Sequence, residues 1–107
     1  MKKGMIKVSI FYPDGDGKTF NMDYYANSHI PMVAGLLGDA VKGASIEKGL
    51  GGADPGSPAQ FVAMGNMYFD SVESFQQSFG PHAGTIMGDI PNYTNIAPVI
   101  QVSEVVV

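Results

Sequence analysis

Tyr24, Tyr25 and His29 stand within six positions of each other, two residues before Pro31, and form the most chemically suggestive stretch of this sequence. In a helix, residues four apart share a face, so Tyr25 and His29 are expected to lie one above the other. An imidazole beside a phenol can pass a proton to or from a bound carbonyl or hydroxyl group at neutral pH. We therefore predict that His29 and Tyr25 form a catalytic pair.

The same stretch also has a structural explanation. Pro31 lacks the N–H of the helical pattern and disfavours the helical conformation at Ile30, so we expect the helix to kink or restart beside His29. A half-buried His29 that donates to the freed carbonyl group would serve the fold alone. Tyr24 and Tyr25 differ by about 100° around a helix, so at most one shares the face of His29. We expect it to be Tyr25.

A second group of polar side chains precedes the last predicted strand. Asn92, Tyr93 and Thr94 belong to a predicted loop, residues 89–95, in which Ile90 is expected to be extended because a proline follows it. Amide, phenol and hydroxyl groups in such a loop can orient a ligand at the mouth of a pocket. They can equally satisfy backbone groups of the loop. We predict that the three side chains contact a ligand.

His82 and Tyr68 complete the predicted ligand-binding residues. The chain has two histidines and no cysteine, which excludes disulfides, thiolate nucleophiles and cysteine-ligated zinc. Convergence of His29, His82 and Asp89 in space would give a metal site, and a single histidine can be an axial haem ligand, but no spacing demands either. We predict no metal and no cofactor.

The hydrophobic pattern defines six elements that would position these residues. Strands are expected at 5–12, 41–48, 60–69 and 99–107, one helix at 22–37, and a second helix from an Asp70 cap, in a capping box with Glu73, to Gly80. Residues 49–58, rich in glycine and proline, are expected to form an exposed loop. The β-α-β-β-α-β order predicts an α+β, ferredoxin-like fold with a four-stranded antiparallel sheet and both helices on one face.

The composition limits the partners of the protein. The chain has 107 residues, 45% of them hydrophobic and 15% charged, which predicts a single domain spanning residues 1–107. Six scattered lysines, no arginine and a net charge of −4 disfavour nucleic acid and favour a small neutral ligand, apolar or aromatic. The second face of the sheet is too apolar to stay in water, which predicts a homodimer around a shared β-core. Without an apparent signal peptide or membrane-spanning run, we expect a cytoplasmic protein.

The chain resembles the EthD family of the dimeric α+β-barrel superfamily, named for ethyl tert-butyl ether degradation. Three segments carry the resemblance: Ile6–Pro13, the pattern Asp23-x-Tyr25-x-x-x-His29-x-Pro31, and residues 89–101 with the sequence DIPNYTNIAPVIQ. The resemblance implies a dimeric barrel with an apolar pocket between sheet and helices. It also implies a small-molecule-binding protein associated with oxidative catabolism. The alternative is a cofactor-independent monooxygenase, isomerase or cyclase that uses His29 as general acid and base.

Overall fold

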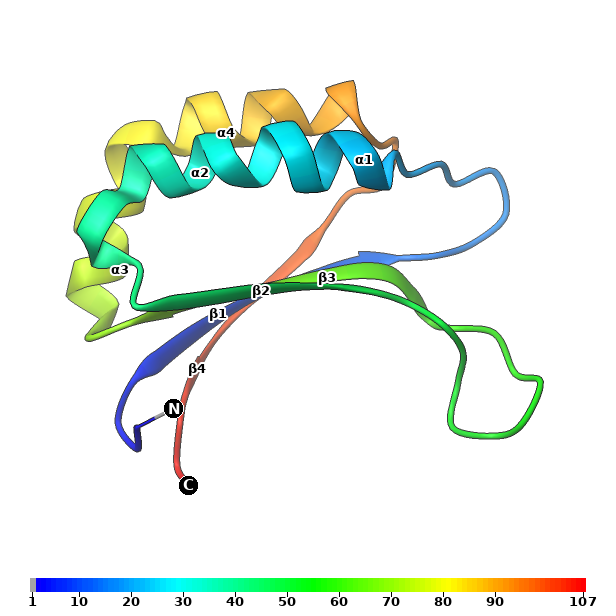
Figure 1. Cartoon of the computed structure of the whole chain (residues 1–107), viewed down its shortest axis with the longest axis horizontal. Coiled ribbons are helices and arrows are strands. Elements are labelled where there is room, and N and C mark those ends of the chain that lie inside the picture. Colours follow the sequence, from blue (N-terminus) through cyan, green and yellow to red (C-terminus); the bar gives the residue numbers. More distant parts are fainter. Residues whose placement is uncertain (1) are drawn as a thin grey trace.

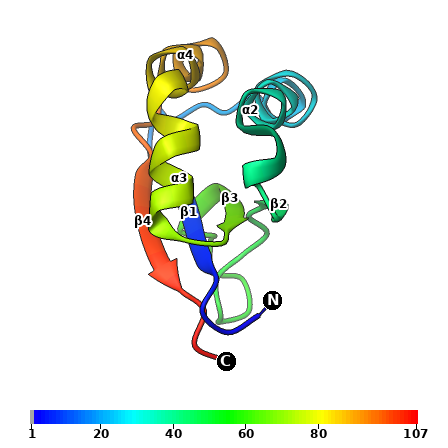
Figure 2. The same cartoon turned by 90° about the vertical axis from the view of Figure 1, so that its left-hand side faces the viewer.

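The computed structural model describes residues 2–107. Its strands and main helices follow the predicted order: β1 (Ile6–Pro13), α1 (Met22–Tyr24), α2 (Ile30–Leu37), β2 (Gly43–Lys48), β3 (Phe61–Phe69), α3 (Val72–Phe79), α4 (Ala83–Asp89) and β4 (Val99–Glu104). The helices form one layer over one face of the sheet (Figures 1 and 2). The loop expected at residues 49–58 is irregular and largely exposed, as its glycines and prolines predict.

The four strands form one antiparallel sheet in the order β2-β3-β1-β4. The register places Ile10 of β1 opposite Gly65 of β3 on one side and opposite Ile100 of β4 on the other. The first strand of the chain is therefore central, flanked by the strands from the middle and the end of the sequence. This topology confirms the predicted ferredoxin-like fold.

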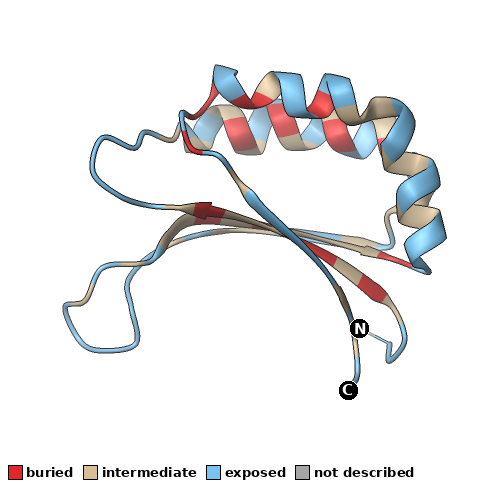
Figure 3. Ribbon diagram, turned by 180° about the vertical axis from the view of Figure 1, so that it is seen from behind, coloured by how far each residue is buried: buried red, intermediate tan, exposed pale blue. Residues whose placement is uncertain are grey.

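The core lies between the helices and one face of the sheet, where the buried residues gather (Figure 3). Because side chains alternate along a strand, the apolar even-numbered residues of β1 face the helices, and Ile6, Val8 and Tyr12 are buried. Two clusters result. The apolar cluster consists of Ile6, Val8, Val33, Leu37, Phe69 and Ile86. The tyrosine cluster consists of Tyr12, Tyr25, Ala63, Ile90, Tyr93 and Ile96.

The first helix is continuous from α1 to α2 but contains a π-helical turn, Tyr25–His29. The N–H of Ile30 donates to the carbonyl of Tyr25, five residues earlier. The irregularity expected beside His29 is confirmed, but the expected departure of Ile30 from helical geometry is wrong, since its φ and ψ are −63° and −44°. A π turn accommodates Pro31 because the wider turn removes the usual clash with the preceding backbone.

The cap of α3 differs from the prediction by one residue. The Oγ atom of Ser71 accepts a hydrogen bond from the backbone N–H of Ser74 at 3.0 Å, so Ser71 is the N-cap. Asp70 instead approaches Lys42 on the surface, with 3.9 Å between Oδ2 and Nζ. The expected Asp70 cap is wrong because the backbone is still extended at Ser71, and the helix begins at Val72.

The segment after α3 is more helical than expected. A 3₁₀ turn, Gly80–His82, leads into α4, and a second 3₁₀ turn, Ile90–Asn92, follows it. Ile90 has φ −55° and ψ −44°, so its expected extended conformation is wrong. The proline after it occupies the start of a 3₁₀ turn, where no backbone donor is needed. The predicted loop therefore begins as helix, and this geometry directs Asp89 toward the first helix.

The sheet face away from the helices mixes apolar and polar side chains. Ser9 donates to Asn66 at 3.1 Å, and Asn66 donates to Glu47 at 2.7 Å. At the edge of the sheet, Val99 of β4 lies opposite Phe11 on this face and is 54% exposed. This face therefore carries a polar row that crosses its apolar surface. None of the helices in residues 2–107 has the length and hydropathy required to span a membrane.

Candidate functional site

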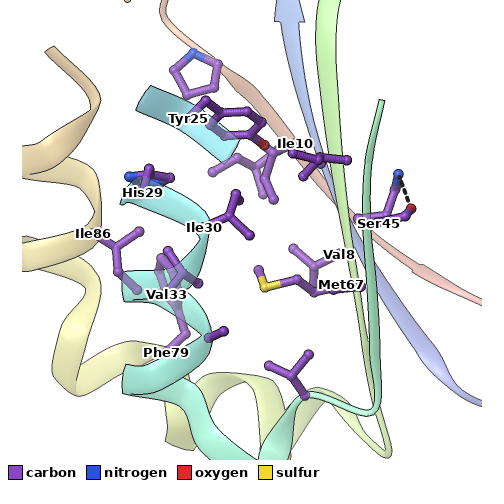
Figure 4. A pocket seen from close by; sticks show the side chains of 18 of the residues that line it. Val8, Ile10, Tyr25, His29, Ile30, Val33, Ser45, Met67, Phe79 and Ile86 are labelled. Carbon is purple, nitrogen blue, oxygen red and sulfur yellow. Dashed lines mark hydrogen bonds between the residues drawn. The ribbon is translucent and has the colours of Figure 1, made fainter. Parts of the chain in front are cut away.

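A cavity of about 180 Å³ lies between the helices and the sheet. Most of its wall is apolar, including Val8, Ile10, Val33, Met67 and Ile86 (Figure 4). Among residues 2–107, no lysine, aspartate or glutamate lines this cavity. Such a wall suits an uncharged, apolar molecule, because a buried ion without a partner is costly.

Tyr25 and His29 provide polar groups at the helix side of the cavity (Figure 4). Their rings are stacked, with centroids 5.8 Å apart and planes 20° apart, so the predicted shared face is confirmed. Both residues are buried, at 1% and 4% exposure. The Nδ1 atom of His29 lies 2.9 Å from Oδ2 of Asp89. The partner of His29 is thus a carboxylate, whereas the structural explanation expected a freed backbone carbonyl.

Asp89 is held by hydrogen bonds on both carboxylate oxygens. Oδ1 accepts from the Tyr24 hydroxyl at 2.7 Å and from Nδ2 of Asn92 at 2.9 Å, while Oδ2 faces His29. The bond from Asn92, with those from His29 and Tyr24, keeps the pKa of Asp89 below its ordinary value. The same contact with Asp89 raises the pKa of Tyr24.

The π turn explains why Tyr24 reaches this carboxylate together with His29. In a regular α-helix, residues five apart diverge around the axis, and the prediction that Tyr24 cannot share the side of His29 assumed that geometry. In the π turn the backbone hydrogen bond joins residues five apart, which widens the turn, and Tyr24 and His29 both contact Asp89. Tyr25 therefore shares the face of His29 as predicted, and the bond from Tyr24 to the same carboxylate is an addition that the sequence did not indicate.

Three buried tyrosines, Tyr12 and Tyr25 in the cavity wall and Tyr93 beside them, pack against one another. The hydroxyl groups of Tyr12 and Tyr93 are 2.7 Å apart and hydrogen-bonded. Burial raises the pKa values of Tyr12, Tyr25 and Tyr93, so all three remain protonated near neutral pH. Tyr25 projects its hydroxyl over Gly65 in β3, where a Cβ atom would overlap it. The glycine in the strand therefore gives the phenol its space.

The other predicted site residues occupy different environments. Tyr93 is buried, with its ring centroid 4.7 Å from that of His29, and Asn92 is exposed and bonded to Asp89. Thr94 donates to the Thr19 carbonyl at 2.6 Å and thereby ties two loops together. Neither Tyr93, Asn92 nor Thr94 lines the cavity.

Tyr68 and His82 lie away from the cavity as well. Tyr68 alternates with the helix-facing residues of β3 and is on the opposite face of the sheet, and His82 is half-buried in a 3₁₀ turn. No set of three metal-ligating side chains gathers in residues 2–107, so His29 and Asp89 meet without His82. The roles of these residues in binding remain predictions.

The sequence did not indicate the contacts that three residues make in and beside the site: Asp89, Tyr24 and Tyr12. The sequence indicates Asp89 only as a possible metal ligand, because its contact with His29 spans 60 positions. The signal for it was the quoted segment 89–101, which begins at this aspartate. No local pattern indicated the partners of Tyr12.

Comparison with known proteins gives the family. A family model for the EthD domain matches residues 17–97. An EthD-like protein from Ralstonia eutropha JMP134, known from its crystal structure, is 48% identical in sequence to this chain. The alignment covers 99% of this chain and 96% of that protein's chain, and the two structures superpose with a TM-score of 0.92. The chain belongs to the EthD family.

More distant structures share the fold. An ethyl tert-butyl ether degradation (EthD) family protein from Bacillus halodurans C-125 is 20% identical, with coverage of 94% of this chain and 97% of its own and a TM-score of 0.65. A dimeric ferredoxin-like protein from Thermobifida fusca YX is 12% identical, with coverage of 98% and 94% and a TM-score of 0.53. A search of curated proteins found no match.

Proposed function

We propose that the protein binds a small apolar or aromatic molecule in the cavity between sheet and helices, within or beside an oxidative catabolic pathway. The observation that carries this proposal is an apolar cavity with Tyr25 and His29 at one side. The apolar wall favours the body of the ligand, and the two polar groups meet its carbonyl or hydroxyl group. The association with oxidative catabolism follows the family, whose relative from Bacillus halodurans carries the name of ether degradation.

The size of the cavity limits the ligand. An apolar cavity on the order of 150 Å³ in another protein holds benzene, and the cavity here has about 180 Å³. One aromatic ring with short substituents fits this space. Burying such a ring removes apolar surface from water at about 25 cal/mol per Å², which is the driving force for binding.

Thermal denaturation with a panel of single-ring aromatics and small ketones tests the binding proposal. A ligand that binds only the folded state raises the melting temperature, by an amount that grows with the logarithm of its concentration relative to Kd. Val33→Phe puts a larger side chain into the cavity wall and should abolish the rise, whereas Val72→Phe, at an exposed position of α3, should retain it. Unchanged melting temperatures across the whole panel would refute binding.

A second candidate function is catalysis with His29 as general acid and base. The contact between His29 and Asp89 favours it, since a carboxylate that orients an imidazole is a common arrangement in proton transfer. Compounds found in the binding screen should be turned over by the wild type and by Asp39→Asn, at an exposed position after α2, but not by His29→Ala. Equal turnover by both variants would remove His29 from the mechanism.

We also propose that the protein is a homodimer that pairs the sheet faces turned away from the helices. Exposed Val99 and half-buried Phe11 and Tyr68 on this face support it, as does the dimeric relative from Thermobifida fusca. Light scattering at micromolar concentration should give twice the mass of one chain. Val99→Lys should shift the mass toward the monomer, and Val72→Lys on α3 should not. A wild-type monomer would contradict the pairing.

A further inference from the structure

We propose that Asp89 is a positioning residue that keeps the proton of His29 on Nδ1, so that Nε2 accepts a hydrogen bond from the ligand. The cavity would then select neutral single-ring phenols and enols over ligands of similar shape that only accept hydrogen bonds. This inference rests on the proposed binding of a small molecule in the cavity.

The first step is the protonation of the contact. An ionised carboxylate accepts hydrogen bonds and donates none. Asp89 receives the Tyr24 hydroxyl and the Asn92 amide on Oδ1, and these contacts lower its pKa. With Asp89 ionised, the 2.9 Å contact between Oδ2 and Nδ1 requires the proton to be on Nδ1 of His29. In the neutral imidazole, Nε2 is then the acceptor.

The second step is the direction of Nε2. The two nitrogens of an imidazole lie on different edges of the ring, so a ring with Nδ1 turned to Asp89 presents Nε2 elsewhere. In residues 2–107, no fully enclosed side-chain nitrogen or oxygen lacks a hydrogen-bond partner. The bond to Asp89 uses Nδ1, so Nε2 reaches accessible space, and His29 lines the cavity. We assign Nε2 to the cavity wall.

The third step concerns the charge of the ligand. With His29 as the neutral imidazole of the first step, no side chain in the cavity wall of the described part of the chain carries a full charge. A buried carboxylate or ammonium ligand would lack an ionic partner, which is a large penalty. Tyr25 stays protonated because burial raises its pKa, so it adds a donor rather than a charge. A neutral ligand with a hydroxyl donor satisfies Nε2 without that penalty.

The affinity ratio of phenol to anisole tests the selection. Phenol donates and accepts hydrogen bonds, whereas anisole only accepts them. The ratio should fall about tenfold from wild type to Asp89→Asn, because an amide allows the other tautomer, in which Nε2 donates to the ether. Asp39→Asn, at an exposed aspartate after α2, should keep the wild-type ratio. Toluene, without polar atoms, should bind both variants and the wild type equally.

Two binding outcomes separate this inference from the proposed function. Equal phenol-to-anisole ratios in wild type and Asp89→Asn would overturn the positioning role and leave binding intact. Failure of phenol, anisole and toluene to bind at all would overturn both.

Nitrogen-15 NMR of the histidine side chains tests the positioning role without any ligand. In the wild type, His29 should show a protonated Nδ1 and an unprotonated Nε2, and Asp89→Asn should change this pattern. His82, which has no contact with Asp89, is the internal reference and should not change. A proton on Nε2 of wild-type His29, alone or together with one on Nδ1, would overturn the inference even if Asp89→Asn proved too unstable for binding measurements.

Discussion

The apolar cluster and the tyrosine cluster lie under the same helices and on the same face of the sheet, yet they are built differently. In the apolar cluster, side chains such as Val8 and Phe69 fill space and need no hydrogen bonds. In the tyrosine cluster, phenol hydroxyls lie in the interior and need partners, as those of Tyr12 and Tyr93 find in each other. Ile10 packs against both clusters.

The helices that cover the two clusters also differ in their regularity. The apolar cluster is covered by regular helix, α2 and α4. The tyrosine cluster is flanked by the π turn Tyr25–His29 and the 3₁₀ turn Ile90–Asn92. Departures from α-helical geometry bring His29 and Asp89 together there. The comparison teaches that regular packing provides the stability of this domain, whereas irregular turns provide the candidate site.

The largest effect is expected from removing a large side chain of the apolar cluster. Phe69 is completely buried, and Phe69→Ala should lower the free energy of unfolding by about 3–5 kcal/mol through lost burial and the cavity left behind. Urea denaturation measures this value. Val72→Ala, at an exposed position of α3, should change stability by less than about 0.5 kcal/mol. A similar loss in both variants would contradict the assignment of Phe69 to the core.

Gly65 tests the tyrosine cluster from the sheet side. A methyl group there would overlap the Tyr25 hydroxyl, so Gly65→Ala should destabilise by about 2 kcal/mol and displace Tyr25 from the cavity wall. Gly35→Ala is the matched control, since a Cβ atom at this exposed helical position meets nothing within 4 Å. It should stabilise α2 by up to about 1 kcal/mol. Denaturation curves in which Gly65→Ala is more stable than Gly35→Ala would refute the close approach of the Tyr25 hydroxyl to Gly65.

The fold could be predicted because it depends on local pattern. Alternation in β1 and β3, the turn-rich loop 49–58 and the helical run 22–37 each indicate their element without knowledge of distant residues. The errors lie at element ends. Asp70 and Ser71 are both good caps, and the backbone conformation at Ser71, which selects between them, depends on how β3 ends.

The site could be predicted only in part. The stacking of Tyr25 and His29 follows from their spacing within one helix, and their place beside an apolar cavity follows from the family resemblance. The bond from Tyr24 to Asp89 has no such local signal, because it forms across a π turn that the sequence does not indicate. The contact from His29 to Asp89 joins two helices, so it depends on their packing and not on any local pattern.

Replacing the carboxylate of Asp89 should have an intermediate, pH-dependent effect. Asp89→Asn should cost about 1–2 kcal/mol at neutral pH, because hydrogen bonds to a charged acceptor become neutral ones. The pKa of Asp89 is lower in the folded state than its ordinary 3.8. The ionised carboxylate of Asp89 therefore stabilises the folded protein fully above the ordinary pKa. This contribution is lost as the pH falls through the folded-state pKa.

Urea denaturation between neutral and acidic pH measures this difference. The difference in free energy of unfolding between wild type and Asp89→Asn should decrease on acidification. Asp39→Asn should have the same pH dependence as the wild type, since Asp39 is exposed in the turn after α2. A gap that stays constant through the acid range would show that Asp89 contributes by shape rather than by charge.

The smallest effect is expected from a single hydroxyl in the tyrosine cluster. Tyr12→Phe removes one partner of the 2.7 Å bond and leaves the buried Tyr93 hydroxyl without it, which should cost about 1 kcal/mol. Tyr12→Phe combined with Tyr93→Phe removes both polar groups and should be less destabilised than the sum of the single variants. Additive losses in this double-mutant cycle would mean that the two hydroxyls do not depend on each other. The tyrosine cluster would then be stabilised by packing alone, as the apolar cluster is.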